Sequence, residues 1–128
     1  MNDLIYKDLS FKINGILFEV HNELGRYANE KQVCDLMEKK FILIELPYER
    51  EFVPNLSDRG EKINRNRLDF IIDRKIILEI KCKSFLTRED YYQIQRYLTS
   101  LNLKLGILIN FRDERLHPKR ILNSLGKE

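Results

Sequence analysis

The sequence predicts an α/β (α+β) protein with a mixed central sheet flanked by helices, in the order α-α-β-β-β-α-β. Near the N-terminus, apolar residues recur every three or four positions, which is the period of an amphipathic helix. Residues 104–111 form a continuous apolar run typical of a strand covered on both faces, and a helical pattern precedes them. Because a strand reached through a helix is usually parallel to the strand before it, the sheet is expected to be mixed.

Length and composition restrict the class of protein. The chain has 128 residues, enough for a single domain over residues 1–128 and too few for two ordinary ones. Its net charge of +3 permits a nucleic-acid partner without arguing for one. No apolar run approaches the roughly 18 residues of a membrane span, and the first residues do not resemble a signal peptide. We therefore expect no membrane association. Cys34 and Cys82 have no metal-binding spacing, so we expect them to be small buried residues in a reducing cytoplasm.

Two helices are expected before the first strand. Apolar residues at helical spacing predict the first over residues 7–24, which Gly25 ends. Asn29 can cap a second helix that runs to Lys39-Lys40. Glu30 lies on the apolar side of that helix, which makes it a candidate site residue. The structural alternative is a first-turn glutamate favoured by the helix dipole.

An extended segment and a hairpin follow. Residues 43–53 suggest extended chain, and Pro47 makes this segment an edge strand or a bent one. Residues 54–60 are rich in turn-forming types. Residues 67–83 then predict two short apolar strands joined by a loop of residues 73–75.

The hairpin contains charged residues that are unusual inside strands. With residues 73–75 as the loop, Asp69 lies directly opposite Glu79 on one face of the sheet. Lys81 is two residues beyond Glu79 and points to the same face. Two adjacent carboxylates repel each other unless a cation lies between them. A divalent metal with an ammonium group beside it suits phosphodiester hydrolysis, while a cross-strand charge pattern with Lys81 as ion-pair partner is the structural alternative.

One more helix and one more strand complete the predicted core. Thr87 to Asp90 has the form of a capping box, with Asp where Glu or Gln is usual. The apolar stripe of the following helix consists of Tyr91, Ile94, Leu98 and Leu101. Gln93 and Tyr97 lie at the border of that stripe, and for Tyr97 packing in the core is at least as good an interpretation as a site role. After the strand at 104–111, residues 120–122 are a short apolar piece in the tail.

This set of residues resembles the PD-(D/E)XK nuclease superfamily. The pattern is Asp69, then Glu79-Ile-Lys81 after a hairpin, with helices before and after. Gln93-Ile-Gln-Arg-Tyr97 resembles the QxxxY motif of the RecB-like branch. Over residues 5–122 the chain is similar to the small bacterial GxxExxY proteins. The similar blocks are Leu24-Gly-Arg26 before Glu30, Tyr48-Glu-Arg-Glu51, Arg67-Leu-Asp69, Leu78-Glu-Ile-Lys81, Gln93 to Leu98, and Leu105 to Phe111.

The resemblance implies a restriction-endonuclease-like core and a metal site. Asp69 and Glu79 are expected to give one carboxylate oxygen each to Mg²⁺ or Mn²⁺, which prefer hard oxygen ligands. The Ile80 backbone carbonyl is expected to add a ligand, and Glu30 to bind directly or through a water molecule. Lys81 is expected to orient or help deprotonate the attacking water, or to offset charge in the transition state.

The remaining roles also come from the resemblance. Gln93 is expected to hydrogen-bond a phosphate, the water or Lys81. Tyr27 stands at the position of the naming glycine and Val33 at that of the naming tyrosine, which leaves the acidic residues of the pattern intact. The candidate catalytic set is Glu30, Asp69, Glu79, Lys81 and Gln93, and the candidate phosphate contacts are Arg65, Arg67, Lys83 and Arg96.

Two functions follow as hypotheses. The first is a Mg²⁺-dependent nuclease that hydrolyses DNA. The second is a catalytically inactive module that keeps the nuclease fold and binds nucleic acid or a protein partner. A homodimer is a further expectation, because a single small core offers little surface to hold a duplex.

Overall fold

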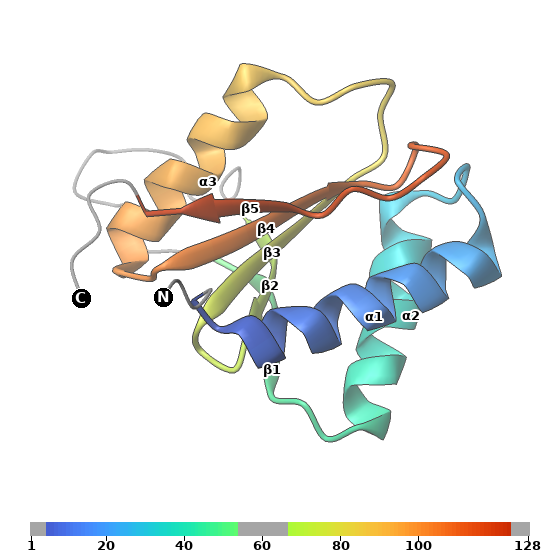
Figure 1. Ribbon diagram of the computed structural model, residues 1–128, viewed down its shortest axis with the longest axis horizontal. Helices are drawn as coiled ribbons and strands as arrows, with labels where there is room; N and C mark the ends of the chain where they lie inside the picture. Colours follow the sequence, from blue (N-terminus) through green and yellow to red (C-terminus); the bar gives the residue numbers. More distant parts are fainter. Residues whose placement is uncertain (1–4, 54–66, 124–128) are drawn as a thin grey trace.

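The computed structural model describes residues 5–53 and 67–123, and it contains the predicted elements in the predicted order, with one strand added (Figure 1). The class, a mixed sheet with helices, is confirmed. The elements are α1 (Lys7–Leu24), α2 (Glu30–Leu43), β1 (Tyr48–Phe52), β2 (Leu68–Ile72), β3 (Ile76–Lys81), α3 (Arg88–Leu101), β4 (Leu105–Asn110) and β5 (Lys119–Leu122).

The five strands form one sheet in the order β1-β2-β3-β4-β5. β3 and β4 are parallel, because α3 carries the chain back between them, and the other neighbouring pairs are antiparallel. In the β2–β3 hairpin Ile72 pairs with Ile76, as the predicted three-residue loop requires. Asp73 and Arg74 adopt left-handed backbone conformations, and Lys75 N donates to Ile72 O at 2.9 Å to close the turn.

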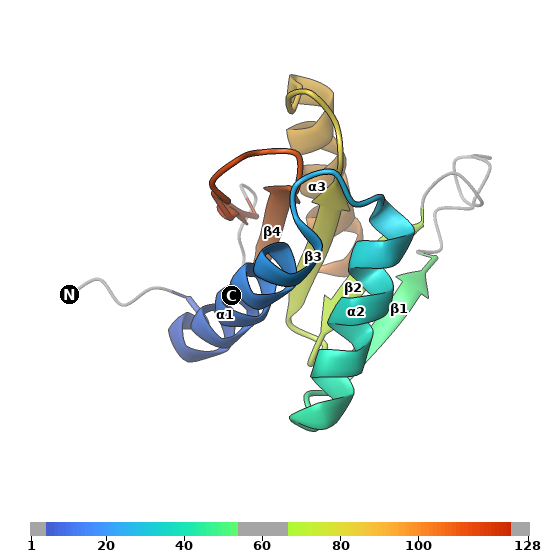
Figure 2. The same ribbon diagram turned by 90° about the vertical axis from the view of Figure 1, so that its right-hand side faces the viewer.

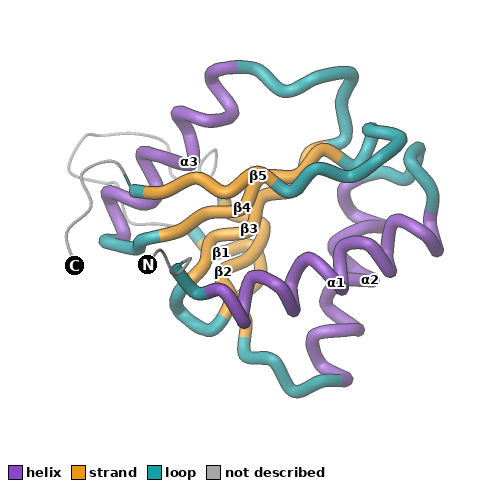
Figure 3. The backbone as a smooth tube through the Cα atoms, viewed as in Figure 1, coloured by secondary structure: helices purple, strands orange, loops and turns teal. Residues whose placement is uncertain are grey.

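Helices cover both faces of the sheet. α1 and α2 lie on one face and α3 on the other (Figures 2 and 3). Along β3 the side chains alternate between these layers: Ile76, Leu78 and Ile80 pack with α1 and α2, while Ile77 packs with α3. Glu79 and Lys81 continue the alternation of Ile77, so they emerge on the side of α3.

The helix ends follow from local chemistry. Gly25 ends α1 with a positive φ of 80°, and its N–H donates to His21 O at 2.8 Å. Asn29 and Gln32 form a reciprocal capping box at the start of α2, as Thr87 and Asp90 do for α3. The predicted α3 cap is therefore confirmed.

The predicted boundary between α2 and the first strand was wrong. The helix continues past Lys39-Lys40 to Leu43, because Phe41 is fully buried against Tyr48 and Phe70. A turn with Glu45 in a left-handed conformation follows, so residues 43–47 are not extended and only Tyr48–Phe52 forms a strand. That strand lies at the edge of the sheet, as Pro47 indicated.

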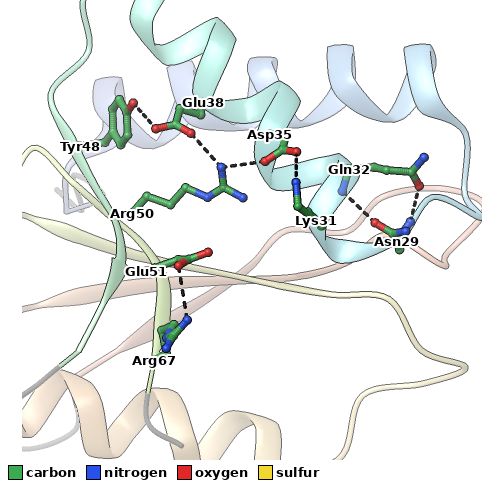
Figure 4. Close-up of polar contacts among 9 residues, drawn as sticks. All are labelled: Asn29, Lys31, Gln32, Asp35, Glu38, Tyr48, Arg50, Glu51 and Arg67. Atoms are coloured by element: carbon green, nitrogen blue, oxygen red, sulfur yellow. Dashed lines mark hydrogen bonds and ion pairs between the residues drawn. The ribbon is translucent and has the colours of Figure 1, made fainter. Parts of the chain in front are cut away.

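A polar network fastens β1 to α2 (Figure 4). Tyr48 Oη donates to Glu38 Oε2 at 2.5 Å, and Arg50 Nη1 lies 2.8 Å from both Glu38 Oε1 and Asp35 Oδ1. The Arg50 guanidinium is largely shielded from water, and the two carboxylates compensate for its lost hydration. The network fixes the edge strand relative to the helix that begins at Glu30.

The added strand, β5, was missed because only Ile121 of its four residues is buried, so its sequence shows no strand period. It forms by pairing with the free edge of β4. Arg120 fixes it to the start of α1, donating to Ser10 Oγ at 3.0 Å and to Ile5 O at 2.8 Å.

Cys34 is buried and Cys82 half-buried, both with free thiols. In residues 5–53 and 67–123, no helix has the length and apolar character that a membrane span needs.

Candidate active site at the open end of the β2–β3 hairpin

Two carboxylates lie where β2 and β3 stop pairing. The regular register of the hairpin ends at Phe70 and Leu78. Beyond that point Asp69 N donates to Glu79 Oε1 at 2.8 Å, and Ile80 N donates to Asp69 Oδ2 at 2.8 Å. Each carboxylate therefore replaces a backbone carbonyl as the acceptor for the opposite strand. The predicted juxtaposition of Asp69 and Glu79 is present, and the backbone fixes both side chains.

Burial makes this pair costly to charge. Glu79 is only 4% exposed, and burial followed by the charge of Asp69 raises the pKa of Glu79 well above its usual range. Burial likewise raises the pKa of Asp69 to about 6, against the opposing effect of the hydrogen bond from Ile80 N. Both shifts mean that the ionised pair lacks compensating positive charge. A cation placed between the two carboxylates would supply it.

Lys81 supplies part of that charge. Its Nζ lies 3.8 Å from Glu79 Oε2, and its side chain is mostly buried. The ammonium group lowers the pKa of both Asp69 and Glu79, although less than burial raises them. The structure thus brings together the three hairpin residues that the sequence pattern selected.

Glu30 lies further from the pair. It is the first residue of α2, its side chain is exposed, and its negative charge contributes to the raised pKa values of Asp69 and Glu79. Within residues 5–53 and 67–123, no three His, Cys, Asp or Glu side chains gather closely enough to hold a metal ion. The charge of Glu30 therefore acts on the close pair, but Glu30 is not part of it.

α3 contributes Tyr97 and Gln93 from the other side. Tyr97 is 2% exposed and packs with Ile94 and Leu98, so the core interpretation of this residue holds. Its hydroxyl makes no hydrogen bond within the described residues. Burial and then the charge of Glu79 raise the pKa of Tyr97 to about 12, and the nearby Gln93 side chain lowers it. Tyr97 thus lies close to the carboxylate pair, and Gln93 lies close to Tyr97.

The predicted phosphate contacts are engaged with carboxylates. Arg67 Nη1 lies 3.4 Å from Glu51 Oε1, and Arg96 Nη2 lies 2.9 Å from Glu89 Oε2 (Figure 4 for Arg67). Lys83 Nζ lies 2.8 Å from Asp90 Oδ2 and so supports the cap of α3. Arg65 lies outside the described residues.

Sequence reasoning missed Asn110, Arg112 and the Arg26–Tyr27 pair, all of which lie at the same end of the sheet. Asn110 is buried and clamps the chain after β3, with Lys83 N donating to Asn110 Oδ1 and Asn110 Nδ2 donating to Lys83 O. The signal available in the sequence was a polar amide residue, Asn110, at the end of a continuous apolar strand. For Tyr27, the signal was an aromatic residue in the turn that follows Gly25.

The available donors suit a hard divalent cation. Asp69 and Glu79 offer carboxylate oxygens that the backbone has already positioned. Because the N–H and C=O of one strand residue point to the same side, the Ile80 carbonyl faces β2 and the carboxylates, as its N–H does. Lys81 O instead accepts from Phe111 N on the β4 side. Two carboxylates and a carbonyl are hard oxygen ligands of the kind that Mg²⁺ or Mn²⁺ prefers.

Comparison with known proteins identifies one family. Residues 7–121 match the family model described as PD-(D/E)XK nuclease superfamily. Neither the curated proteins nor the solved structures include a significant match to this chain.

Proposed function

The chain belongs to the PD-(D/E)XK nuclease superfamily, and from this we propose that it is a Mg²⁺- or Mn²⁺-dependent nuclease that hydrolyses DNA phosphodiester bonds. The observation that carries the proposal is the hairpin site, where Asp69 and Glu79 are held by each other's strands and Lys81 Nζ lies 3.8 Å from Glu79. The family match covers all three residues.

The proposed roles follow from position and charge. Asp69, Glu79 and the Ile80 carbonyl would hold the metal, and Glu30 would add a further carboxylate from the start of α2. When bound, the metal would supply positive charge to activate water and neutralise the phosphate. Lys81 binds the attacking water or offsets the charge that develops on the phosphate oxygens. Gln93, beside Tyr97 on α3, hydrogen-bonds the water, the phosphate or Lys81.

A cleavage assay tests the proposal. The purified chain is incubated with linear, nicked and single-stranded DNA in Mg²⁺ or Mn²⁺, beside the variants Asp69→Ala and Asp73→Ala. Asp73 is a matched control, since it is a partly exposed aspartate in the turn of the same hairpin. We expect cleavage by the wild type and by Asp73→Ala only. The proposal fails if no substrate is cut, or if Asp69→Ala cuts as well as the wild type.

A second candidate is an inactive module that keeps the fold to bind nucleic acid or a protein. The observation in its favour is that Glu30 stands apart from the close carboxylate pair, with no cluster of three ligating side chains in the described ranges. Isothermal titration with Mn²⁺ separates the two candidates. Binding at one site that disappears in Glu79→Ala supports the nuclease, and an absence of heat supports the module.

Three finer assignments are part of the same proposal. We assign the chain to the GxxExxY proteins and to the RecB-like branch, on the residue blocks described above. We propose a cytoplasmic location, with which the free thiols of Cys34 and Cys82 agree. We also propose a homodimer, and a monomeric mass in light scattering at micromolar concentration would exclude it.

A further inference from the structure

An exposed aromatic ring, that of Tyr27 in the turn that joins α1 to α2, lies near two arginines: Arg26 in the same turn and Arg112 in the turn after β4. Tyr27 is 74% exposed, although tyrosine usually buries most of its ring. The guanidinium carbon of Arg26 lies 5.1 Å from the centre of the ring, and that of Arg112 lies 5.5 Å from it. Both distances are within the range of cation–π contacts. The two arginines therefore hold an otherwise solvated ring in place.

Backbone carbonyls position these arginines. Arg26 Nε donates to Arg112 O at 2.9 Å, and Arg112 Nη2 donates to Cys82 O at 3.4 Å. Arg112 Nε is buried and has no hydrogen-bond partner in the described chain. Neither arginine forms an ion pair with any of the carboxylates described, unlike Arg67 and Arg96. Two positive charges thus lie together, and no carboxylate of residues 5–53 or 67–123 forms an ion pair with either of them.

This cluster lies at the same end of the sheet as the hairpin site. Cys82, whose carbonyl accepts from Arg112, directly follows Lys81. Arg112 itself comes two residues after Asn110, the partner of Lys81 in the parallel register of β3 and β4. Figures 1 and 2 show the α1–α2 turn beside the turn that follows β4.

A histidine reinforces this contact between the two turns. His21 Nε2 lies 3.2 Å from Phe111 O and 3.1 Å from Asp113 O, so the end of α1 is bound to the chain that carries Arg112. The cluster is therefore a fixed part of the fold at this end of the sheet.

From this arrangement we infer that Arg26, Tyr27 and Arg112 bind an unpaired nucleotide next to the hydrolytic site. The base stacks on Tyr27, and the adjacent phosphate binds the two guanidinium groups. A base paired inside a duplex has no free face, so the substrate is a nucleic acid with a single-stranded segment at this point. The inference rests on the proposed nuclease function and adds its substrate class.

Nucleic acid is the occupant that fits all parts of the cluster. The guanidinium groups need an anion and the exposed ring needs a flat partner, and a nucleotide supplies both at adjacent positions. An acidic peptide would meet the charges but would leave the stacking ring unused unless it also carried an aromatic side chain.

The test measures binding without cleavage, in an Asp69→Asn background and in EDTA. Fluorescence anisotropy compares a labelled short single-stranded DNA, the same strand with abasic sites, and the blunt duplex. We expect Tyr27→Ala to weaken binding of the intact single strand about tenfold, the size of one lost stack, and to change binding of the abasic strand and the duplex far less. Tyr27→Phe should bind like the parent.

Matched controls lie at the far end of α1. Phe11 is 79% exposed and Lys12 is exposed, so Phe11→Ala and Lys12→Gln should leave binding unchanged. Arg26→Gln and Arg112→Gln should weaken binding of all three probes and reduce its dependence on salt. Circular dichroism melts establish that each variant is folded, and the result from Tyr27→Ala does not depend on the arginine variants.

Several results would overturn the inference: no binding of any probe, unchanged single-strand binding by Tyr27→Ala, or an equal loss for duplex and single strand. These outcomes are separable from a failure of the proposed function. If the wild type cuts nothing but Tyr27-dependent binding is observed, the nuclease proposal falls and the nucleotide site stands. If DNA is cut and Tyr27→Ala binds normally, the reverse holds.

Discussion

The Asp69 and Glu79 carboxylates each accept a hydrogen bond from a backbone N–H of the opposite strand. Asp69 N donates to Glu79 Oε1, and Ile80 N donates to Asp69 Oδ2, both at 2.8 Å. Two largely buried acids at the end of a hairpin should force its strands apart. Here they also satisfy the N–H groups that the separation exposes, so neither strand is left with unpaired donors at this point. The carboxylates are therefore positioned before any cation binds, at the cost of crowding two negative charges.

That crowding should make the metal-free protein less stable at neutral pH. The pKa of Asp69 is raised to about 6 in the folded protein. A carboxyl with a raised folded pKa adds to the stability of the protein at pH values below its unfolded pKa. This contribution is lost as the pH rises through the folded pKa. Asp69→Asn removes this loss and keeps an oxygen for Ile80 N. We expect the variant to be more stable than the wild type in EDTA at pH 7.5, by about 3 kcal/mol, and the difference to shrink at pH 5. Urea denaturation at the two pH values measures it.

Asp35→Asn is the control for this prediction. Hydrogen bonds from Lys31 and Arg50 lower the pKa of Asp35, so its contribution to stability has the opposite pH dependence and is lost as the pH falls. Asp35→Asn should therefore gain nothing at pH 7.5. A wild type whose stability in EDTA does not fall between pH 5 and 7.5 would contradict the argument.

Metal ions should restore the stability that crowding removes. We expect Mn²⁺ to raise the melting temperature of the wild type, because a ligand that binds only the folded state stabilises it. The rise should be smaller at pH 5 than at pH 7.5, since protons compete for the carboxylates. Glu79→Gln should abolish the rise, while Glu30→Gln should reduce it. An equal rise in all three proteins would show that Mn²⁺ binds elsewhere.

Lys81 should matter for the chemical step more than for metal binding. Its Nζ lies 3.8 Å from Glu79 Oε2, beside the carboxylates. We expect Lys81→Gln to lower the cleavage rate by about a hundredfold or more, a typical effect of losing one charge-stabilising group. It should still bind Mn²⁺ in calorimetry. Lys75→Gln, in the turn of the same hairpin, is the control and should cut normally; loss of Mn²⁺ binding in Lys81→Gln would instead assign Lys81 a structural role.

The hairpin site was predictable because its geometry follows from the positions of the residues along the two strands. Once residues 73–75 are the loop, the alternation of strand side chains places Asp69 opposite Glu79 and Lys81 beside it. Local chemistry likewise fixed the caps at Asn29 and Thr87. These features depend on neighbouring residues in the chain, which a sequence displays directly.

The missed features depend on contacts between distant segments. β5 forms only because β4 has a free edge, and Arg112 meets Arg26 only because the turns after β4 and α1 lie side by side. The separation of β2 and β3 beyond Phe70 is local, but it arises because the carboxylates compete with the backbone carbonyls for N–H groups. Neither the pattern of apolar residues nor the motif spacing contains that information.

The last prediction concerns the support of α3, which carries Gln93 and Tyr97. At Gly106 in β4, α3 lies very close to the sheet. A Cβ added there would lie 2.6 Å from Ile94 Cγ2, whereas one added at Gly15 or Gly25 would meet nothing within 4 Å. Ile94 is fully buried, so its side chain cannot simply turn away. Gly106→Ala should therefore lower the free energy of unfolding by about 1–3 kcal/mol, the usual cost of overpacking a core.

A second substitution tests that explanation. In Gly106→Ala/Ile94→Ala the clashing atom is gone, so the double variant should be more stable than the sum of the single losses predicts. Gly15→Ala is the control, because a Cβ at Gly15 meets nothing within 4 Å and α1 favours alanine over glycine. Urea denaturation of the four variants and the wild type measures the coupling. Strict additivity would mean that the methyl group introduced at position 106 does not meet Ile94, and that α3 is held to β4 in some other way.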